Sequence, residues 1–502
     1  MSALVPLPIV LPLGGAALSI LVGRHRRAQR VVSLAVLACT LAVSVVLLVR
    51  ADRDGFVTHH SGGWSADLGI VLVVDRLAGL MLVVGALVLF AVMVFAVGEA
   101  DEEQQRVGFH PVYLVLAAGV SASFVTADLF NLFVAFEMML AASYVLLTLG
   151  GRPDQVRSGM SYVVISLVAS TLFITVLALL YSATGTVNMA DLSVRLAELD
   201  PAVRAAFALA LLVVFAIKAG LFPLFFWLPD SYPTAPGPVT AIFAGLLTKV
   251  GVYAIIRTQT LLFDAPGWMG TVLLIAAILT MVVGVLGAIA QDDMKRILAF
   301  HIISQIGYMI LGLGLFTVAG IAGAVFYIVH HIVVKTALFL VSGLVARRGG
   351  TSRLSEVGGL VRTAPMIAVL FAVPALSLAG LPPFSGFLAK FALVDAGLDD
   401  GAVVAIVAVG ASLAVGLLTL YSMTKIWSGV FWGIREFDPP VEPKHEGRFG
   451  SPWAMLAGTG LLVVASLAVS VWAGLLYDVA ERAADDLLQP SGYVEAVLEP
   501  AP

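Results

Sequence analysis

Apolar runs long enough to cross a lipid bilayer recur from one end of this chain to the other. A membrane-spanning helix needs about 20 predominantly apolar residues. Fourteen such segments can be drawn, at approximately 3–22, 31–49, 70–97, 110–126, 128–149, 159–182, 204–228, 237–261, 268–290, 297–317, 320–345, 364–394, 402–430 and 453–478. The 502 residues are 60% hydrophobic and 12% charged, about half the charged share of soluble proteins. This excludes a soluble enzyme, a nucleic-acid-binding protein and a disordered scaffold.

The segments predict an all-α polytopic membrane protein with about 14 transmembrane helices in a lipid bilayer. They are about twice as long as barrel strands and do not alternate in polarity. The stretches between them are too short to fold as domains with their own cores, and no Walker or Rossmann glycine motif is present. Cys39 is the only cysteine, which excludes disulfides and cysteine-ligated metal sites within the chain. We therefore expect no bound cofactor or metal, and no catalytic residues of an enzyme.

The loop charges predict an orientation. Arginines and lysines gather in loops that follow odd-numbered spans, as at Arg26, Arg152, Arg296 and Arg348, and are scarce in loops that follow even-numbered spans. Cytoplasmic loops are enriched in these residues. Odd-span loops should therefore face the cytoplasm of a prokaryotic cell, with both termini outside the plasma membrane. The first apolar run precedes its arginines, which is the wrong order for a cleaved signal peptide, so we interpret it as a membrane span.

An internal repeat is visible at an offset of about 160–165 residues. Residues 219–223 read Ala-Gly-Leu-Phe-Pro, and residues 379–383 read Ala-Gly-Leu-Pro-Pro. Weaker matches link spans 5 and 6 to spans 10 and 11. Because each unit would have five helices, the second copy would be inverted, as in many ion transporters. We therefore divide the chain into helices 1–3 (1–109), a first repeat of helices 4–8 (110–262), a second repeat of helices 9–13 (263–430), and helix 14 with a C-terminal tail (431–502).

Prolines interrupt one span in each predicted repeat. Pro223 lies in span 7, and Pro382 and Pro383 lie in span 12. Proline breaks the helical hydrogen-bond pattern, and at membrane depth the freed carbonyls must be buried in protein or face water. Broken helices at matching positions point to an ion pathway, although each could also be a simple packing kink.

Lysine and arginine are distributed differently. Five of the 7 lysines lie inside apolar spans, whereas the arginines lie in loops or near span ends. A buried lysine can lose its proton, whereas arginine does not. The spans therefore retain the titratable base, and this separation indicates proton transfer.

Glu137 is the only glutamate well inside a span, about 14 Å along its helix from Asp128 at 1.5 Å per residue. A carboxylate at this depth needs a partner, and Lys218 is the natural candidate. We expect the two groups to approach within ion-pair distance or through one water. Such a pair could switch the protonation of the lysine, or it could be a static ion pair that fixes helix packing.

Further titratable residues continue this series along the chain. Lys249 lies in the middle of span 8, His331 and Lys335 share one face of span 11 at i, i+4 spacing, and Lys390 follows the break in span 12. We predict a proton path of Glu137, Lys218, Lys249, His331, Lys335 and Lys390 along the middle of the membrane. Secondary candidates are His301 and His330, each of which could be an ordinary core histidine, and Lys425, which could simply extend to the membrane surface.

Three segments of the sequence resemble the antiporter-like subunit family, which includes the proton-pumping membrane subunits of respiratory complex I. They are 124–150 (FVTADLFNLFVAFEMMLAASYVLLTLG), 292–310 (DDMKRILAFHIISQIGYMI) and 377–390 (SLAGLPPFSGFLAK). Within this family, segment 128–140 and the chain length are most similar to the D-type subunits of Mrp-type multisubunit Na⁺/H⁺ antiporters.

The resemblance implies a fourteen-helix fold with discontinuous helices 7 and 12. It also implies the family's glutamate at Glu137, its helix-7, helix-8 and helix-12 lysines at Lys218, Lys249 and Lys390, and its helix-11 pair at His331 and Lys335. The implied partners are the other Mrp subunits, and the implied ions are H⁺ and Na⁺. Two alternatives remain: a proton-pumping subunit of complex I or of a membrane-bound hydrogenase, and a structural membrane subunit without transport.

Overall fold

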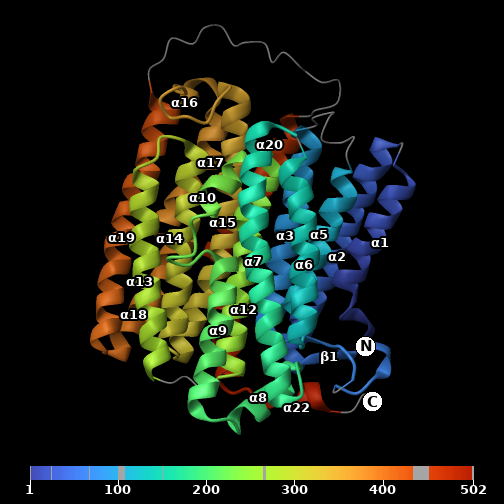
Figure 1. Cartoon of the computed structure of the whole chain (residues 1–502). Coiled ribbons are helices and arrows are strands. Elements are labelled where there is room, and N and C mark those ends of the chain that lie inside the picture. Colours follow the sequence, from blue (N-terminus) through green and yellow to red (C-terminus); the bar gives the residue numbers. More distant parts are fainter. Residues whose placement is uncertain are drawn as a thin grey trace.

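The computed structural model describes residues 2–23, 25–66, 68–99, 108–149, 151–263, 267–433 and 452–499. The chain is nearly all-helical (Figure 1). Its first half contains α1 (Leu7–Leu21), α2 (Arg26–Asp54), β1 (Val57–His60), β2 (Val71–Val74), α3 (Arg76–Glu99), α5 (Phe109–Val125), α6 (Leu129–Thr148), α7 (Pro153–Thr184), α8 (Met189–Ala197), α9 (Pro201–Ala219), α10 (Leu228–Ser231), α11 (Gly237–Ile242), the π-helix η4 (Phe243–Leu247) and α12 (Thr248–Leu261). Its second half contains α13 (Gly267–Ile289), α14 (Met294–Gly314), α15 (Val318–Gly349), α16 (Leu360–Thr363), α17 (Pro365–Ala379), α18 (Ser385–Asp400), α19 (Val403–Trp427), the π-helix η5 (Ser428–Trp432), α20 (Pro452–Val471), α21 (Ala473–Leu488) and α22 (Ser491–Leu498).

The described residues include eleven helices that are long and apolar enough to cross a membrane, and three shorter apolar helices, α1, α5 and α17. Long apolar helices satisfy their own backbone hydrogen bonds, which a bilayer core requires. The chain is therefore a multi-pass membrane protein, as its composition predicted. The count of fourteen spans stays a prediction, since it depends on how the shorter and broken helices are assigned.

The bundle has two distinct ends (Figure 1). The β1–β2 hairpin, α8, α22 and both termini lie at one end, which we call the hairpin end, and α16 lies at the opposite end. The strands are antiparallel, with Val57 opposite Val74. The expected single span at 70–97 is wrong at its start. Residues 71–74 pair as a strand, and the helix begins at Arg76 after the capping residue Asp75, whose carboxylate accepts the Ala78 amide at 2.8 Å.

The last predicted span, 453–478, also needs correction. The helix α20 ends at Val471, and α21 follows after Trp472, whose backbone is not helical. The face of α21 that carries Ala480 and Leu487 is buried, whereas Arg482 is exposed. One face of α21 is thus apolar and the other charged. It packs on α15 and α3, and brings the C-terminal α22 to the hairpin end (Figure 1).

Two helices are interrupted inside the bundle. The first, α9, ends at Ala219 and the chain turns at Gly220 (φ 79°) before α10. The second, α17, ends at Ala379 and turns at Gly380 (φ 88°) before α18. Both glycines have the left-handed conformation that commonly ends a helix and that other residues adopt at a cost. Each interruption leaves backbone carbonyls at the end of a half-helix without their helical partners.

Candidate functional site

Glu137 and Lys218 meet through one hydroxyl group. Lys218, in the last turn of α9, donates a hydrogen bond from Nζ to Ser170 Oγ on α7 at 3.1 Å, and Ser170 Oγ donates to the Glu137 carboxylate on α6. Lys218 also reaches the carbonyl of Ser166 at 3.4 Å. The side chain of Lys218 is 8% exposed, and Glu137 is half-buried. The serine occupies the place in which we expected a direct contact or one water.

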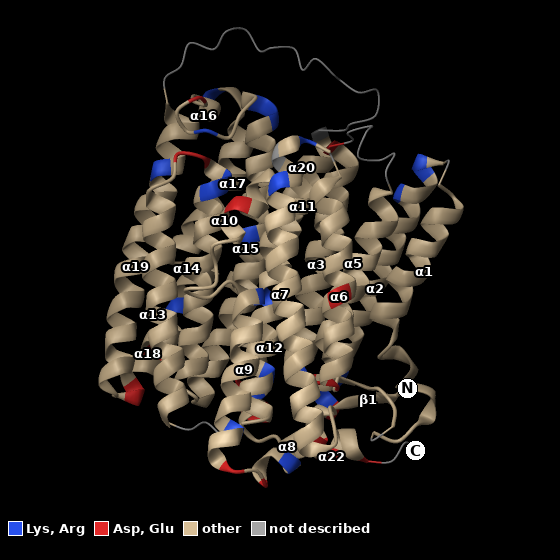
Figure 2. Ribbon diagram, in the orientation of Figure 1, with Lys and Arg blue, Asp and Glu red and all other residues tan. Residues whose placement is uncertain are grey.

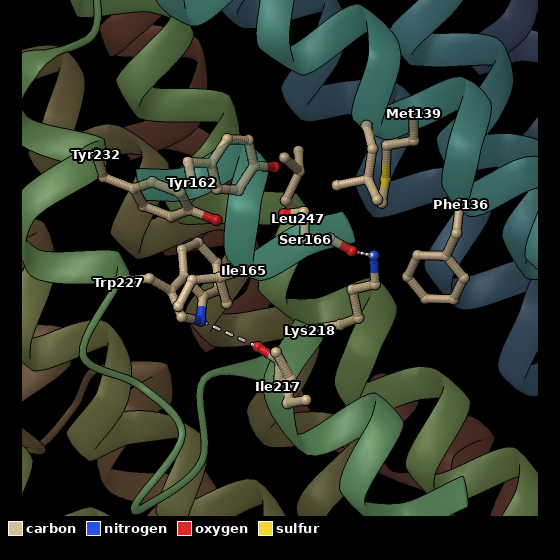
Figure 3. Close-up of a pocket in the computed structure, with 11 residues that line it drawn as sticks. Phe136, Met139, Tyr162, Ile165, Ser166, Ile217, Lys218, Trp227, Tyr232 and Leu247 are labelled. Carbon is tan, nitrogen blue, oxygen red and sulfur yellow. Dashed lines mark hydrogen bonds between the residues drawn. The ribbon is translucent and has the colours of Figure 1, made fainter. Parts of the chain in front are cut away.

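A small cavity adjoins this contact (Figure 3). Its volume is about 20 Å³, which is enough for one water molecule. The close-up shows Lys218 between the apolar side chains of Phe136 and Met139 and the carbonyl of Ser166, to which it is hydrogen-bonded. The ammonium group also lies 5.8 Å from the centre of the Phe136 ring. Lys218 is therefore held in a largely apolar setting, with few polar partners besides the serines.

Lys249 follows a local widening of its helix. Residues Phe243–Leu247 form a π-helical turn, and Lys249 Nζ donates to the Ala244 carbonyl at 2.7 Å and to Thr248 Oγ1 at 3.1 Å. Such turns leave one carbonyl out of the helical pattern and are frequent at functional sites. The lysine is fully buried, and both of its hydrogen bonds are to its own continuous helix.

His331 and Lys335 lie on α15, which is buried across most of its length. Both side chains are fully buried, and both ring nitrogens of His331 and Nζ of Lys335 have no hydrogen-bond partner among the described residues. The charges of Lys249 and Lys335 interact with each other and with His331. Buried polar atoms are nearly always hydrogen-bonded, to protein or to ordered water. His331 and Lys335 thus bring unbonded titratable nitrogens within electrostatic reach of Lys249.

Each of the two secondary histidines contacts a serine on another helix of the second half of the chain. His301 on α14 lies with Nε2 2.8 Å from Ser422 Oγ and interacts electrostatically with Lys335 and Lys390. His330 places Nδ1 2.9 Å from Ser385 Oγ, at the start of α18. His330 thus faces the interrupted helix, whereas its neighbour His331 faces Lys249 and Lys335.

Lys390 folds back over the interruption that precedes it. Its Nζ donates to the carbonyls of Leu378 and Ala379, each at 3.1 Å, at the end of α17. A Cβ atom on Gly380 would lie 2.9 Å from the flexible side chain of Lys390, so it is mainly the positive φ of 88° that favours glycine there. Nζ also lies 5.0 Å from the centre of the Tyr308 ring. The broken helix thus supplies the acceptors that hold this lysine.

Two charged residues have structural partners away from this series. Lys425 donates to the carbonyls of Ile289 and Gln291, at 3.0 and 2.6 Å, and so caps the end of α13. Arg257 lies near the end of its span, four residues before Leu261, as expected for the arginines, but its side chain is only 4% exposed and is ion-paired with Asp75 at 2.6 Å. Figure 2 shows that the charged residues gather mainly at the two ends of the bundle.

Taken together, these side chains make two groups. One is Glu137, Ser170 and Lys218, and the other comprises Lys249, His331, Lys335, His301 and Lys390. The helices that carry Lys218 and Lys249 pack closely, because a Cβ on Gly251 of α12 would lie 3.0 Å from the Lys218 backbone carbon. Groups of this kind can hold and pass protons. In the part of the chain that the structure describes, no cluster of three or more His, Cys, Asp or Glu is placed to hold a metal ion.

Sequence reasoning missed the polar residues that connect the titratable ones. These are Ser170 and Ser385, together with the π-helical turn before Lys249. Serine is common in membrane helices and usually bonds to a carbonyl of its own helix. The one available signal was that Ser166 and Ser170 are four residues apart and so share a helix face.

Comparison with known proteins gives a consistent family assignment. Residues 126–415 match the family model described as NADH:quinone oxidoreductase/Mrp antiporter, TM. The D-type subunit of the Na⁺/H⁺ antiporter of Alkalihalophilus pseudofirmus is 46% identical over 99% of this chain and 100% of its own. The D-type subunit of the Na⁺/H⁺ antiporter of Bacillus subtilis is 36% identical, again over 99% and 100%.

Solved structures show the same fold. A chain of the Mrp complex from Dietzia sp. DQ12-45-1b superposes with a TM-score of 0.91 at 36% identity, covering 99% of both chains. A chain of the membrane-bound sulfane sulfur reductase, an archaeal respiratory membrane complex, superposes with a TM-score of 0.89 at 26% identity, covering 99% of this chain and 100% of the other.

Proposed function

Because the chain belongs to the NADH:quinone oxidoreductase/Mrp antiporter transmembrane family, we propose that it is the D-type, proton-carrying subunit of an Mrp-type multisubunit Na⁺/H⁺ antiporter. The proton-motive force would drive protons through its buried lysines and histidines, coupled to sodium export. Similarity to named D-type antiporter subunits over the full length of the chain supports this function. In this role the chain is an ion-transporter subunit and not an enzyme.

The observation that carries the proposal is the contact of Glu137, Ser170 and Lys218. A lysine ammonium donates to a hydroxyl, and that hydroxyl donates to a carboxylate. While the contact is closed, the carboxylate stabilises the charged lysine. If the helices separate, the apolar surroundings of Lys218 favour its neutral form. The proton would then be released toward Lys249 and the second group of residues, through His331 and Lys335 to Lys390.

The alternative is a redox-driven pump subunit. The likeness to a chain of an archaeal respiratory complex shows that the fold also occurs in redox complexes. The identity is 26% there, against 46% for a D-type antiporter subunit that matches along its whole length. The antiporter is therefore the function we propose, and complex I or a membrane-bound hydrogenase is the function against which it must be tested.

Two matching backbone contacts support the proposed repeats at 110–262 and 263–430. Asp128 caps α6 and forms an isolated antiparallel backbone bridge with Asn188. Asp293 caps α14 and forms the same kind of bridge with Arg353. Each residue of the second pair lies 165 positions after its counterpart. The hydrogen bond from the Leu129 amide to the Val187 carbonyl recurs at the same offset. The first contact adjoins α8 at the hairpin end and the second precedes α16 at the opposite end (Figure 1), as an inverted repeat requires.

The proposal also includes location and partners. The chain would lie in the plasma membrane of a prokaryote with the hairpin end outside, and would assemble with the other Mrp subunits. The described parts of its interior are lined by lysines at Lys218, Lys249, Lys335 and Lys390. These lysines repel a bare cation in a low-dielectric setting, so sodium would cross elsewhere in the complex.

The test is cation exchange with and without an electron donor. The whole operon is expressed in a host that lacks its own antiporters, and everted vesicles are given a proton gradient made either by ATP hydrolysis or by respiration. We expect added Na⁺ to dissipate the ATP-driven gradient with no redox substrate present. A requirement for an electron donor would overturn the proposal in favour of a redox pump. Assembly without any exchange would favour a structural subunit.

A further inference from the structure

Arg257 is a buried charge that the proton path does not use. It lies eight residues after Lys249 on α12, so it is about 12 Å nearer the hairpin end, at 1.5 Å per residue. Tyr253 stands between them, and the i, i+4, i+8 spacing keeps all three on one side of the helix. The row therefore leads from the middle of the bundle to its hairpin end.

The ion pair at the end of this row is buried, and two tyrosine rings cover it. Two nitrogens of Arg257 contact both carboxylate oxygens of Asp75, at 2.6 and 2.8 Å. The guanidinium carbon lies 5.4 Å from the centre of the Tyr253 ring and 5.2 Å from that of Tyr493 on α22. The Tyr493 ring packs in turn against Phe56 at 6.1 Å. The side chains of Arg257 and Asp75 are 4% and 3% exposed.

The direction of each hydrogen bond decides what this cluster can do. A proton relay needs groups that accept a proton at one atom and release another. Arginine has only donors and keeps its proton. The Tyr253 hydroxyl accepts from Arg257 at 3.3 Å and donates to the Phe124 carbonyl at 2.7 Å, where the chain of donors ends. Asp75 is occupied by Arg257 and by the Ala78 amide.

We propose that the Asp75–Arg257 ion pair, covered by Tyr253 and Tyr493, is a barrier that stops protons from passing between Lys249 and the hairpin end of the molecule. This inference rests on the proposed function, because a barrier matters only where a proton path exists. A titratable residue in place of Arg257 would complete a direct route across the membrane beside Lys249. The fixed pair forces the proton to leave Lys249 toward α15 instead.

The experiment measures proton leak in the absence of sodium. The whole complex is reconstituted into sodium-free liposomes that contain a pH-sensitive dye, and a potassium diffusion potential drives protons inward. The test variant carries Asp75→Asn and Arg257→Gln together, because removing both charges avoids leaving one buried and unpaired. The matched control carries Asp191→Asn and Arg195→Gln, which removes an exposed ion pair (2.9 Å) on α8 at the same end.

We expect the test variant to leak about tenfold faster than wild type, as a pore does when its electrostatic barrier is removed, and the control to remain as tight as wild type. Adding Lys249→Ala to the test variant should abolish the leak. A test variant as tight as wild type, or a leak that persists without Lys249, would overturn the inference. If the test variant does not assemble, Arg257→Lys is measured instead, since lysine can release its proton in a buried site. A faster leak then supports the barrier and an unchanged leak rejects it.

Sodium addition to the same liposomes separates the two proposals. Wild-type complex that shows no Na⁺/H⁺ exchange contradicts the proposed function itself. Wild-type exchange together with a tight test variant contradicts only the barrier.

Discussion

At the scale of single residues, the contact between Glu137 and Lys218 depends on a third side chain. Ser170 accepts from the lysine and donates to the carboxylate, so it fixes the distance at which the two charges influence each other. A serine hydroxyl can rotate and exchange partners, whereas a direct ion pair must break to release its proton. The hydroxyl makes the contact suitable for repeated opening and closing.

Replacing Ser170 with alanine should therefore slow exchange without preventing assembly. A hydrogen bond to a charged group contributes about 1.5 kcal/mol or more, which corresponds to about tenfold in rate. The control is Thr171→Ala on the next position of α7, because Thr171 is exposed and bonds only to its own helix at Leu167, 2.9 Å away. Na⁺/H⁺ exchange per assembled complex is the measurement. Equal rates for the two variants would show that the hydroxyl carries no proton.

The titratable residues could be predicted from the sequence, and their connections could not. Glu137, Lys249 and Lys335 stand out because an ionisable side chain in an apolar span is costly and needs a reason. No such cost marks Ser170 or Ser385, since a serine in a membrane helix can bond to its own backbone. The burial of Arg257 could not be predicted, because the sequence does not show that Asp75, far away in the chain, folds against it.

At the scale of helices, close packing aligns the lysines. Gly251 on α12 faces the end of α9, and a Cβ atom there would lie 2.7 Å from the Ala219 nitrogen and 3.0 Å from the Lys218 carbon. These are backbone atoms, which cannot move away alone. The glycine therefore allows the helix of Lys249 to approach the helix of Lys218.

The Gly251→Ala variant should separate these helices and reduce exchange. Overpacking in a tight core costs about 1–3 kcal/mol, so the melting temperature of the purified complex should fall as well. The Gly410→Ala variant on α19 is the control, because a Cβ atom at Gly410 meets nothing within 4 Å. Both quantities are measured on both variants. The account of α9–α12 packing is wrong if Gly251→Ala exchanges and melts like Gly410→Ala.

Hydropathy predicted where helices lie but not how they are interrupted. The apolar run at 70–97 contains a strand and a helix, because Val71–Val74 is as apolar as the helix and pairs with a polar stretch, Val57–His60. Prolines and glycines marked the breaks at Gly220 and Gly380. The π-helical turn Phe243–Leu247 has no such residue pattern. It depends on neighbouring helices, which a single sequence does not reveal.

At the scale of the whole molecule, the bundle has two ends, which we predict to lie in opposite compartments. α16 lies at one end, and both termini lie at the hairpin end (Figure 1). In the part of the chain that the structure describes, Arg347 and Arg348 lie in the last turn of α15, Arg353 lies on the segment that leads to α16, and Arg362 lies in α16. From the positive-inside rule we therefore predict that the α16 end faces the cytoplasm. Protons would enter from outside and leave at the α16 end.

Cysteine labelling tests this orientation. In a Cys39→Ser background, Ser65→Cys places a thiol in the exposed loop between the strands, and Thr363→Cys places one at an exposed position of α16. A membrane-impermeant maleimide should label the Ser65→Cys variant in intact cells. It should label the Thr363→Cys variant only in everted vesicles. The reverse pattern would contradict the predicted orientation and the direction of proton flow.

The central claim is that protons pass through this chain by way of Glu137 and Lys218, and the most direct test is Na⁺/H⁺ exchange by the assembled complex. Everted vesicles energised without a redox substrate would carry wild type, Glu137→Ala, Lys218→Ala or Thr171→Ala, with assembly measured in parallel. The account predicts exchange by wild type and Thr171→Ala, and loss of exchange in the first two variants despite normal assembly. Full exchange by an assembled Glu137→Ala complex would contradict it, because the ions would then cross elsewhere.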